Sequence, residues 1–448
     1  MGVRAVLYSL SEYSKNRPGL RLVLGNIGWL FFEKIFRMIG GLVIGVWIAR
    51  HLGPDNFGKL NYATAFAGLF SVIATLGLNS IVVRDLINFQ NDKDEILGTA
   101  FALQVISGIF SLLLMVAAIH FVRPDDTLGI WMVMIIGGGQ VLRAGDVIRY
   151  WFEARSTLRN SVLVDNGAFI LTSILKILLL LSDANLLAFV WVGLVESALM
   201  TLGLFSIYGR SGSSFRSWTW TIKQAKKLLH ASWPLILSGL AVTVYMRIDQ
   251  IMLGQIVGDE AVGVFSAATR LSEVFYFIPI VISAAVFPSI IKAKKIGEKE
   301  FLDRLQKFFN ALTIVAISIA LPLSLLSKQI VSAFYGAEYS DASAIFGIHI
   351  WACVFVFLGV SGSRWFLAEN LQRLSFYRTL AGAVLNVALN FVLIPRFGAL
   401  GAAVATVISQ AMACFFFNAF IKRTRVLFWM QCKSLVSFLP PWQSRWRH

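Results

Sequence analysis

Long apolar stretches, separated by short polar segments, run through almost the whole chain. A helix needs roughly 20 apolar residues to cross a bilayer core of about 30 Å, and each of these stretches is long enough to do so. They lie at residues 20–49, 60–83, 96–121, 127–151, 157–181, 184–207, 229–256, 261–291, 306–327, 342–367, 374–394 and 398–421. The pattern predicts an all-α, polytopic membrane protein with about 12 transmembrane helices.

Two short sequence patterns of the first half recur in the second half. The matching segments are Gly53–Ala65 with Gly258–Arg270, and Trp151–Ala154 plus Arg159 with Trp365–Ala368 plus Arg373. Repeats with an even number of helices run parallel and are related by an axis along the membrane normal. We therefore expect two pseudo-symmetric six-helix lobes with a cleft between them. The expected divisions are a basic N-terminus (1–19), an N-lobe (20–207), a connector (208–228), a C-lobe (229–421) and a basic aromatic tail (422–448).

The lysine and arginine residues indicate which ends of the helices face the cytoplasm. With the N-terminus inside, about 29 of them fall on inner segments and only 5 on outer loops. Positive residues concentrate in cytoplasmic loops. This bias requires an even number of crossings and predicts that both termini are cytoplasmic.

Composition excludes several other classes of protein. Hydrophobic residues make up 57% of the 448 positions and charged residues 14%, and the mean hydropathy is +0.72. This leaves too little polar surface for a soluble globule. The net charge of +16 is spread along the chain with no nucleic-acid motif, so we expect no nucleic-acid partner. The three cysteines and five histidines have no metal-like spacing, and we expect no cofactor, no metal site and no catalytic cluster.

Charged residues interrupt the predicted helices and are the candidates for a functional site. The basic ones are Lys34, Arg37, Arg143, Lys176, Arg247 and Arg270, and the acidic ones are Glu33, Asp146, Asp165, Glu196, Asp249 and Glu273. Each costs about 2.5–3.5 kcal/mol at a helix centre on insertion scales, so they should face a bundle interior or a wet cavity.

Two interpretations of these charges remain open. In the first, residues three or four apart on one helix neutralise each other; the pairs are Glu33 with Arg37, Arg143 with Asp146, and Arg270 with Glu273. In the second, the cations face the cleft. Arg247 and Asp249 point away from each other and need partners elsewhere, and Lys34 has no partner on its own helix once Glu33 takes Arg37.

A cationic cleft suits a ligand with a negative head, because arginine offers planar, bidentate donors to phosphate oxygens. The candidate residues for binding a diphosphate are Lys34, Arg37, Arg143, Arg247 and Arg270. A carboxylate in a partly dry site has a raised proton affinity, so Asp249, Glu273 and Glu33 are the candidates for a coupling proton or sodium ion.

Several motifs together resemble one known family. They are Ala49–Gly58 (ARHLGPDNFG), Arg247–Gly254 (RIDQIMLG), Val262–Ala268 (VGVFSAA), and a late segment with Asn386, Asn390, Leu393–Pro395, Gly398, Gly401–Ala403 and Ala405–Thr406. The sequence from about residue 20 to 421 is similar to the polysaccharide biosynthesis flippases of the Wzx type. These are the O-antigen branch of the multidrug/oligosaccharidyl-lipid/polysaccharide exporter superfamily.

The resemblance implies a multi-pass protein of the bacterial inner membrane. Such a protein moves undecaprenyl-pyrophosphate-linked oligosaccharide, used for O-antigen or another surface polysaccharide, from the cytoplasmic to the periplasmic leaflet by alternating access driven by an ion gradient. It implies two six-helix lobes in a V and a cationic cavity lined by the first, second, seventh and eighth helices. The implied partners are the lipid-linked oligosaccharide, membrane lipids, a polysaccharide polymerase and a chain-length regulator.

Two other functions are weighed against this one. A cation-coupled multidrug antiporter of the same superfamily would use a cavity dominated by carboxylates and aromatics, whereas the charges here lean cationic. A membrane glycosyltransferase or polymerase would need a large outer loop, and no outer loop here exceeds about twenty residues. We therefore expect a transporter and not an enzyme.

Overall fold

The computed structural model describes residues 18–437, and describes side chains for 34–437 except that of Ala285. The predicted N-terminal segment (1–19) therefore lies outside the described residues except for Pro18 and Gly19, and the predicted tail (422–448) is described only as far as residue 437. Within that range the chain forms α-helices linked by short turns, with no strand. The all-α prediction is confirmed.

Contacts group the helices into two compact units. Unit 1 comprises residues 1–44 and 70–239, and unit 2 comprises residues 45–69 and 240–448. Two helices, α2 (Pro18–Thr75) and α9 (Ile222–Ile256), contribute to both units. The remaining helices of unit 1 are α3 (Asn79–Asn88), α4 (Lys93–Val122), α5 (Thr127–Leu142), α6 (Val147–Ala154), α7 (Arg159–Leu181) and α8 (Leu186–Arg210). Those of unit 2 are α10 (Asp259–Glu273), α11 (Phe277–Ile296), α12 (Glu298–Leu325), α13 (Ser327–Tyr335), α14 (Ala342–His349), α15 (Ala352–Ala368), α16 (Gln372–Ala411), α17 (Phe417–Phe420) and α18 (Arg425–Val436).

Ten helical segments of the described chain are long and apolar enough to cross a membrane. Two of them contain a glycine with non-helical backbone, Gly53 (φ 70°, ψ 171°) and Gly398 (φ 54°, ψ −135°). Glycine tolerates positive φ at no steric cost, so each of these segments divides into two helices. Counted in this way the described residues hold twelve spans, as the hydrophobic pattern predicts.

Several predicted helices are broken where the pattern shows an uninterrupted apolar run. The second one ends at Thr75, and Leu76 (φ 51°) and Gly77 (φ 59°) turn the chain before α3 begins. A broken helix leaves carbonyl groups without partners, and inside a membrane the protein must supply them. Ser107 on α4 donates to the carbonyl of Ala74 at 2.8 Å, and Gln104 donates to that of Thr75 at 3.3 Å.

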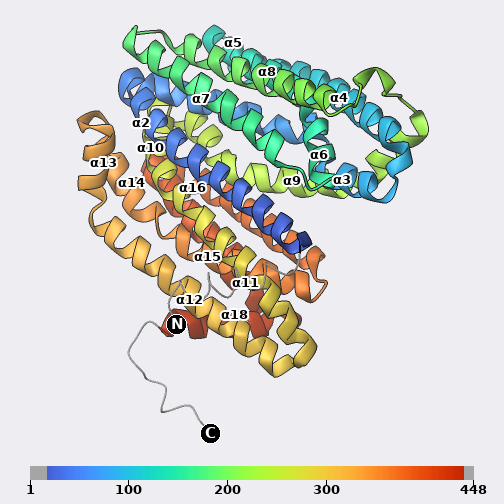
Figure 1. Ribbon diagram of the computed structural model, residues 1–448. Helices are drawn as coiled ribbons and strands as arrows, with labels where there is room; N and C mark the ends of the chain where they lie inside the picture. The colour runs from blue at the N-terminus through green and yellow to red at the C-terminus, as the bar shows by residue number, and fades with distance from the viewer. Residues whose placement is uncertain (1–17, 438–448) are drawn as a thin grey trace. The chain divides into compact units, whose positions relative to one another are not determined.

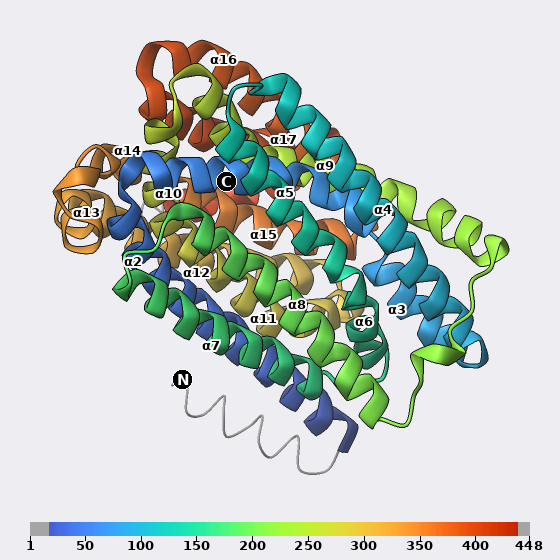
Figure 2. The same cartoon turned by 90° about the horizontal axis from the view of Figure 1, so that it is seen from above.

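In unit 1, helices α4, α5, α7 and α8 lie side by side (Figures 1 and 2). An aromatic core lies at one end of this group of helices, next to α6 and the connector. Trp151 lies 5.1 Å from the ring of Tyr208, and Trp218 of the connector donates from Nε1 to the hydroxyl of Tyr208 at 3.0 Å. Thr219 donates to the carbonyl of Asp94 at 3.2 Å. The connector therefore packs as part of unit 1.

In unit 2, helix α12 packs against α11, α15 and α18 (Figure 1). Helix α18 comes from the predicted tail and is held by polar contacts. Gln306 donates to the carbonyl of Met430 at 2.9 Å, and the hydroxyls of Thr313 and Ser434 lie 3.0 Å apart. Trp429, by contrast, is exposed.

The Trp-Phe repeat folds in the same way in both units. Ser156 and Asn370 occupy corresponding positions after it and both have positive φ, 55° and 56°. The amide of Thr157 donates to the carbonyl of Phe152 at 2.9 Å, and that of Leu371 donates to Phe366 at 2.8 Å. The matching residues thus end two helices with the same turn.

Candidate functional site

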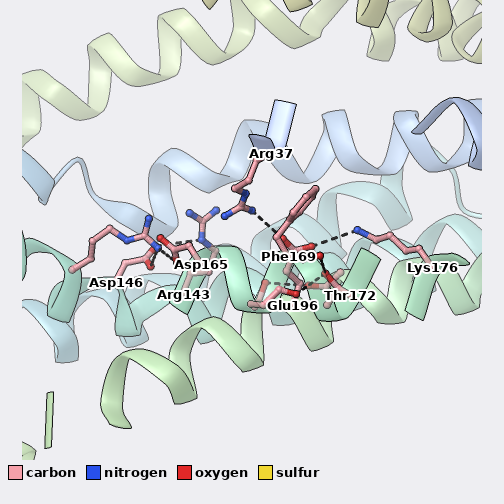
Figure 3. A network of polar contacts seen from close by, with 12 residues as sticks. Arg37, Arg143, Asp146, Asp165, Phe169, Thr172, Lys176 and Glu196 are labelled. Carbon is pink, nitrogen blue, oxygen red and sulfur yellow. Dashed lines mark hydrogen bonds and ion pairs between the residues drawn. The ribbon is translucent and has the colours of Figure 1, made fainter. Parts of the chain in front are cut away.

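Two cations inside the helices of unit 1 meet at one carboxylate. Arg37 of α2 lies 3.0 Å from Glu196 of α8, and Lys176 of α7 lies 3.4 Å from the other oxygen of the same carboxylate (Figure 3). Arg37 also lies over the ring of Phe169 at 5.4 Å. All three charged side chains are partly buried. Two cations share one carboxylate, so this group carries a surplus positive charge.

A second network in unit 1 follows the turn between α5 and α6. Arg143 contacts Asp146 at 3.3 Å, and Arg149 bridges Asp146 at 3.4 Å and Asp165 of α7 at 2.8 Å (Figure 3). Asp165 is buried, with 1% of its side chain exposed, whereas Arg143 is 58% exposed. The predicted pair of Arg143 and Asp146 therefore forms, and most of the Arg143 guanidinium remains accessible to a ligand.

The cations of unit 2 have a different environment. Arg270 of α10 lies 5.4 Å from the ring of Phe57 and against Gly45 of α2, where any side chain would overlap its Nη1. Arg247 of α9 is partly buried and interacts electrostatically with Glu273 and Arg270. Within the described residues, neither arginine has a carboxylate oxygen within 4.0 Å.

Two tyrosines lie near Arg270 at the α13 end of unit 2. Tyr335 packs on Tyr339 with ring centroids 5.2 Å apart, and Tyr339 donates to the carbonyl of Ala49 at 2.8 Å. Burial raises the pKa of Tyr335 to about 12, against the opposing effect of Arg270. The Tyr335 hydroxyl is therefore neutral at physiological pH and does not neutralise Arg270.

Asp249 lies in a polar pocket within unit 2. Its two carboxylate oxygens accept hydrogen bonds from Nδ2 of Asn390 and from the hydroxyl of Thr406, and Asn390 also donates to Asn386 at 3.2 Å. Asp249 and Glu273 both line a cavity of about 20 Å³ together with Tyr276, His349 and Gln410. This space is large enough for one water molecule or one small ion, since about 10–15 Å³ on this measure suffices for a water. No group of three or more ligands of the His, Cys, Asp and Glu types occurs in the described chain.

The structure changes two of the pairings that helical spacing predicts. Arg37 pairs with Glu196, which is 159 residues away, and the side chain of Glu33 lies outside the described residues. Arg270 and Glu273 form no ion pair within 4.0 Å, because Arg270 lies instead against Phe57 and Gly45. Lys34 is exposed on α2.

Helical spacing predicts no partner and no ligand for several residues of these groups. Lys176 and Glu196 stand 20 residues apart on neighbouring helices, so helical spacing gives no reason to link them. Asn386 and Asn390 did carry a usable signal. Amides four residues apart share one face of a helix, and two of them in an otherwise apolar span need a buried polar partner, here Asp249.

The model of one protein family matches most of the chain. Residues 23–294 match the family described as polysaccharide biosynthesis protein. The chain belongs to this family. Residues 234–392 also match the MatE family model. The family match agrees with the resemblance found in the motifs.

Curated relatives of the family match over most of their length. The capsular polysaccharide biosynthesis protein CapF of Staphylococcus aureus is 21% identical over 89% of this chain and 99% of its own. The probable flippase AglR of Haloferax volcanii is 24% identical over 85% of this chain and 80% of its own. A putative O-antigen transporter of Shigella flexneri is 20% identical over 86% and 94%.

Solved structures show that this family member shares a transporter fold. The lipid II flippase MurJ in an inward closed conformation superposes with a TM-score of 0.74 at 16% identity, covering 92% of this chain and 91% of that one. An inward-facing multidrug resistance MATE transporter gives 0.72 at 16% identity, covering 91% and 98%. The chain therefore shares with these two structures an all-α fold, with about twelve spans in its described residues.

Proposed function

We propose that the protein is a flippase for a lipid-linked oligosaccharide. It would move an undecaprenyl-pyrophosphate-linked repeat unit, of O-antigen or another surface polysaccharide, from the cytoplasmic to the periplasmic leaflet of the bacterial inner membrane by alternating access. Both termini are assigned to the cytoplasm. Support comes from the family membership and from relatives whose names describe a flippase and O-antigen transporters. A polysaccharide polymerase and a chain-length regulator are the proposed partners.

One observation carries the substrate assignment. Arg247 and Arg270 lie partly buried in membrane-spanning helices and have no carboxylate within ion-pairing distance in the described residues. A guanidinium away from water needs a counter-charge, and Glu273, which interacts electrostatically with both arginines, can balance only one of them. The diphosphate of the carrier lipid would supply it, in the bidentate geometry that arginine favours.

The cations of unit 1 support the same assignment. Arg37 and Lys176 share Glu196, so one positive charge remains for a ligand, and Arg143 keeps most of its surface accessible. Lys34 is exposed on the same helix as Arg37. We assign Lys34, Arg37, Arg143, Arg247 and Arg270 to the diphosphate.

Asp249 is the proposed site of the coupling ion, with Glu273 beside the same small cavity. A sodium ion prefers oxygen ligands, and the carboxylate of Asp249 lies beside the hydroxyl oxygen of Thr406, while the amide nitrogen of Asn390 links it to the amide oxygen of Asn386. A proton is the alternative, because a buried carboxylate gains proton affinity. Glu33 remains a further candidate for the coupling ion, with its side chain outside the described residues.

The deciding experiment complements a deletion strain with Arg247→Ala, Arg270→Ala and the matched lysine variants. We expect both alanine variants to insert normally and to lose most surface polysaccharide, with the lipid-linked sugar accumulating inside. We expect the lysine variants to retain part of the activity, because they keep the charge and lose the planar fork. Normal surface polysaccharide at undiminished protein levels in both alanine variants would remove these arginines from the site.

The match to the MatE model favours a second function, a cation-coupled multidrug antiporter. The same strains distinguish the two functions. A drug antiporter would change resistance to cationic dyes on deletion and leave the surface polysaccharide intact, whereas a flippase would do the reverse.

A further inference from the structure

A second cavity lies in unit 1, and no residue of the two charged networks described above lines it. It has a volume of about 520 Å³ and forms where the turn after α3 meets the turn after α6. Its lining includes Gln90, Lys93, Trp151, Ala154, Arg155 and Thr157. Candidate membrane spans end at Asn88 and at Ala154, so the cavity lies at the ends of two apolar helical segments. Its size is typical of a small-molecule site, for which about 300–1,000 Å³ is usual.

Two cations line this cavity and both lie beside one indole ring. The guanidinium of Arg155 lies 4.6 Å from the ring centroid of Trp151, and Nζ of Lys93 lies 5.8 Å from it. Lys93 also contacts Asp94 at 3.5 Å and Ser213 at 3.4 Å. Within the described chain, Arg155 forms no ion pair or hydrogen bond from its side chain. A guanidinium stacked on an aromatic ring keeps its N–H edge available for an oxyanion.

The internal repeat supplies a comparison for this site. Arg155 follows Trp151–Ala154, and Glu369 follows the matching Trp365–Ala368 at the corresponding position. In unit 2 the ammonium of Lys294 lies 2.7 Å from Glu369 and donates to the carbonyl of Ala368 at 2.6 Å. The turn in unit 2 therefore carries the anion that neutralises a neighbouring cation. The same turn in unit 1 carries a cation in place of that anion.

We propose that this cavity of unit 1 binds a phosphate headgroup of a membrane lipid. The phosphate oxygens take the role that the Glu369 carboxylate has in unit 2 and contact Lys93 and Arg155, while the buried ring of Trp151 holds the Arg155 guanidinium in place. Basic pockets between helices on the cytoplasmic side are a known form of lipid site. The phosphate comes either from an anionic phospholipid or from the diphosphate of a polyprenyl carrier. The proposal concerns binding alone and does not rest on transport.

Native mass spectrometry of the purified full chain in detergent tests this proposal. Dioleoylphosphatidylglycerol and farnesyl diphosphate serve as the two anionic probes, and dioleoylphosphatidylcholine measures binding without net charge. We expect Lys93→Gln combined with Arg155→Gln to weaken binding of at least one anionic probe roughly tenfold, or about 1.4 kcal/mol. Loss for phosphatidylglycerol alone identifies a bulk lipid, loss for farnesyl diphosphate alone identifies the carrier, and loss for both means that the site accepts either.

Two controls separate a built site from a general charge effect. Lys292→Gln combined with Lys295→Gln removes two exposed cations from unit 2 and should change affinity by less than about twofold. Lys93→Arg combined with Arg155→Lys keeps both charges and should stay within about threefold of the unaltered protein. The proposal is overturned if the glutamine pair at 93 and 155 binds both anionic probes as tightly as the unaltered protein, or if the pair at 292 and 295 weakens binding equally.

Discussion

Gly58 and Gly263 face each other across the contact between α2 and α10. A Cβ on Gly58 would overlap the carbonyl oxygen of Asp259 and lie 2.9 Å from the amide of Gly263, and a Cβ on Gly263 would overlap the carbonyl oxygen of Pro54. The two glycines occupy matching positions in the repeated segments that begin at Gly53 and Gly258. Each copy of the repeat therefore contributes one glycine to the close contact between α2 and α10, within unit 2.

Replacing either glycine of this pair should loosen the contact. In Gly58→Ala and in Gly263→Ala the new methyl meets backbone, which cannot rotate away, so the helices must separate. Overpacking of this kind costs roughly 1–3 kcal/mol, and thermal unfolding in detergent will measure it. The control is Gly68→Ala on the same helix, because a Cβ there meets nothing within 4 Å. Equal melting temperatures for all three variants would contradict the close packing.

The hydrophobic pattern predicts the helices well, because a span needs only a long apolar run whatever its neighbours are. It does not predict which helices touch. Helical spacing links Arg37 to Glu33, yet the ion pair is with Glu196, on a helix reached only through the tertiary fold. The repeated glycines are visible in the sequence, whereas their mutual contact depends on the packing of α2 on α10.

Breaks inside helices are the other feature that the pattern does not reveal. Arg143 and Asp146 belong to a predicted continuous helix and lie in a short 3₁₀ turn instead. The pair survives because residues three apart also share a face in a 3₁₀ turn. Leu76, with positive φ, breaks an apolar run that carries no signal other than the adjacent Gly77.

Removing Glu196 should destabilise the protein more than removing Arg37. In Glu196→Gln, Arg37 and Lys176 lose the carboxylate that they share, and both partly buried cations remain without it. In Arg37→Gln, Glu196 keeps Lys176. We expect Glu196→Gln to cost roughly 1–3 kcal/mol and Arg37→Gln less than about 1 kcal/mol, measured by thermal unfolding in detergent.

The pair of Lys59 and Asp55, whose carboxylate is 58% exposed, provides the control for this comparison. Lys59→Gln should change stability by less than about 0.5 kcal/mol. If Arg37→Gln proves as destabilising as Glu196→Gln and surface polysaccharide is unaffected, Arg37 has a structural role and no part in the diphosphate site.

Thr406 should tune the affinity for the coupling ion through its hydroxyl. Thr406→Val keeps the shape of the side chain and removes the donor to Asp249, whereas Thr406→Ser keeps the donor. A hydrogen bond to a charged group contributes about 1.5–3 kcal/mol, so we expect the sodium or proton concentration for half-maximal transport in proteoliposomes to change at least roughly tenfold in the valine variant only. Identical behaviour of the two variants would separate Thr406 from coupling, and a fully active Asp249→Asn would exclude the site.

Cysteine labelling from outside the cell should reveal the orientation that the positive charges predict. In a background with Cys353, Cys414 and Cys432 replaced by alanine, we expect a membrane-impermeant maleimide to modify single cysteines at Asp125 and Ser340, and to reach one at Asn160 only after the membrane is opened. All three positions are exposed, so burial does not hide them. Labelling of position 160 in intact cells would reverse the topology, and with it the proposed direction of transport.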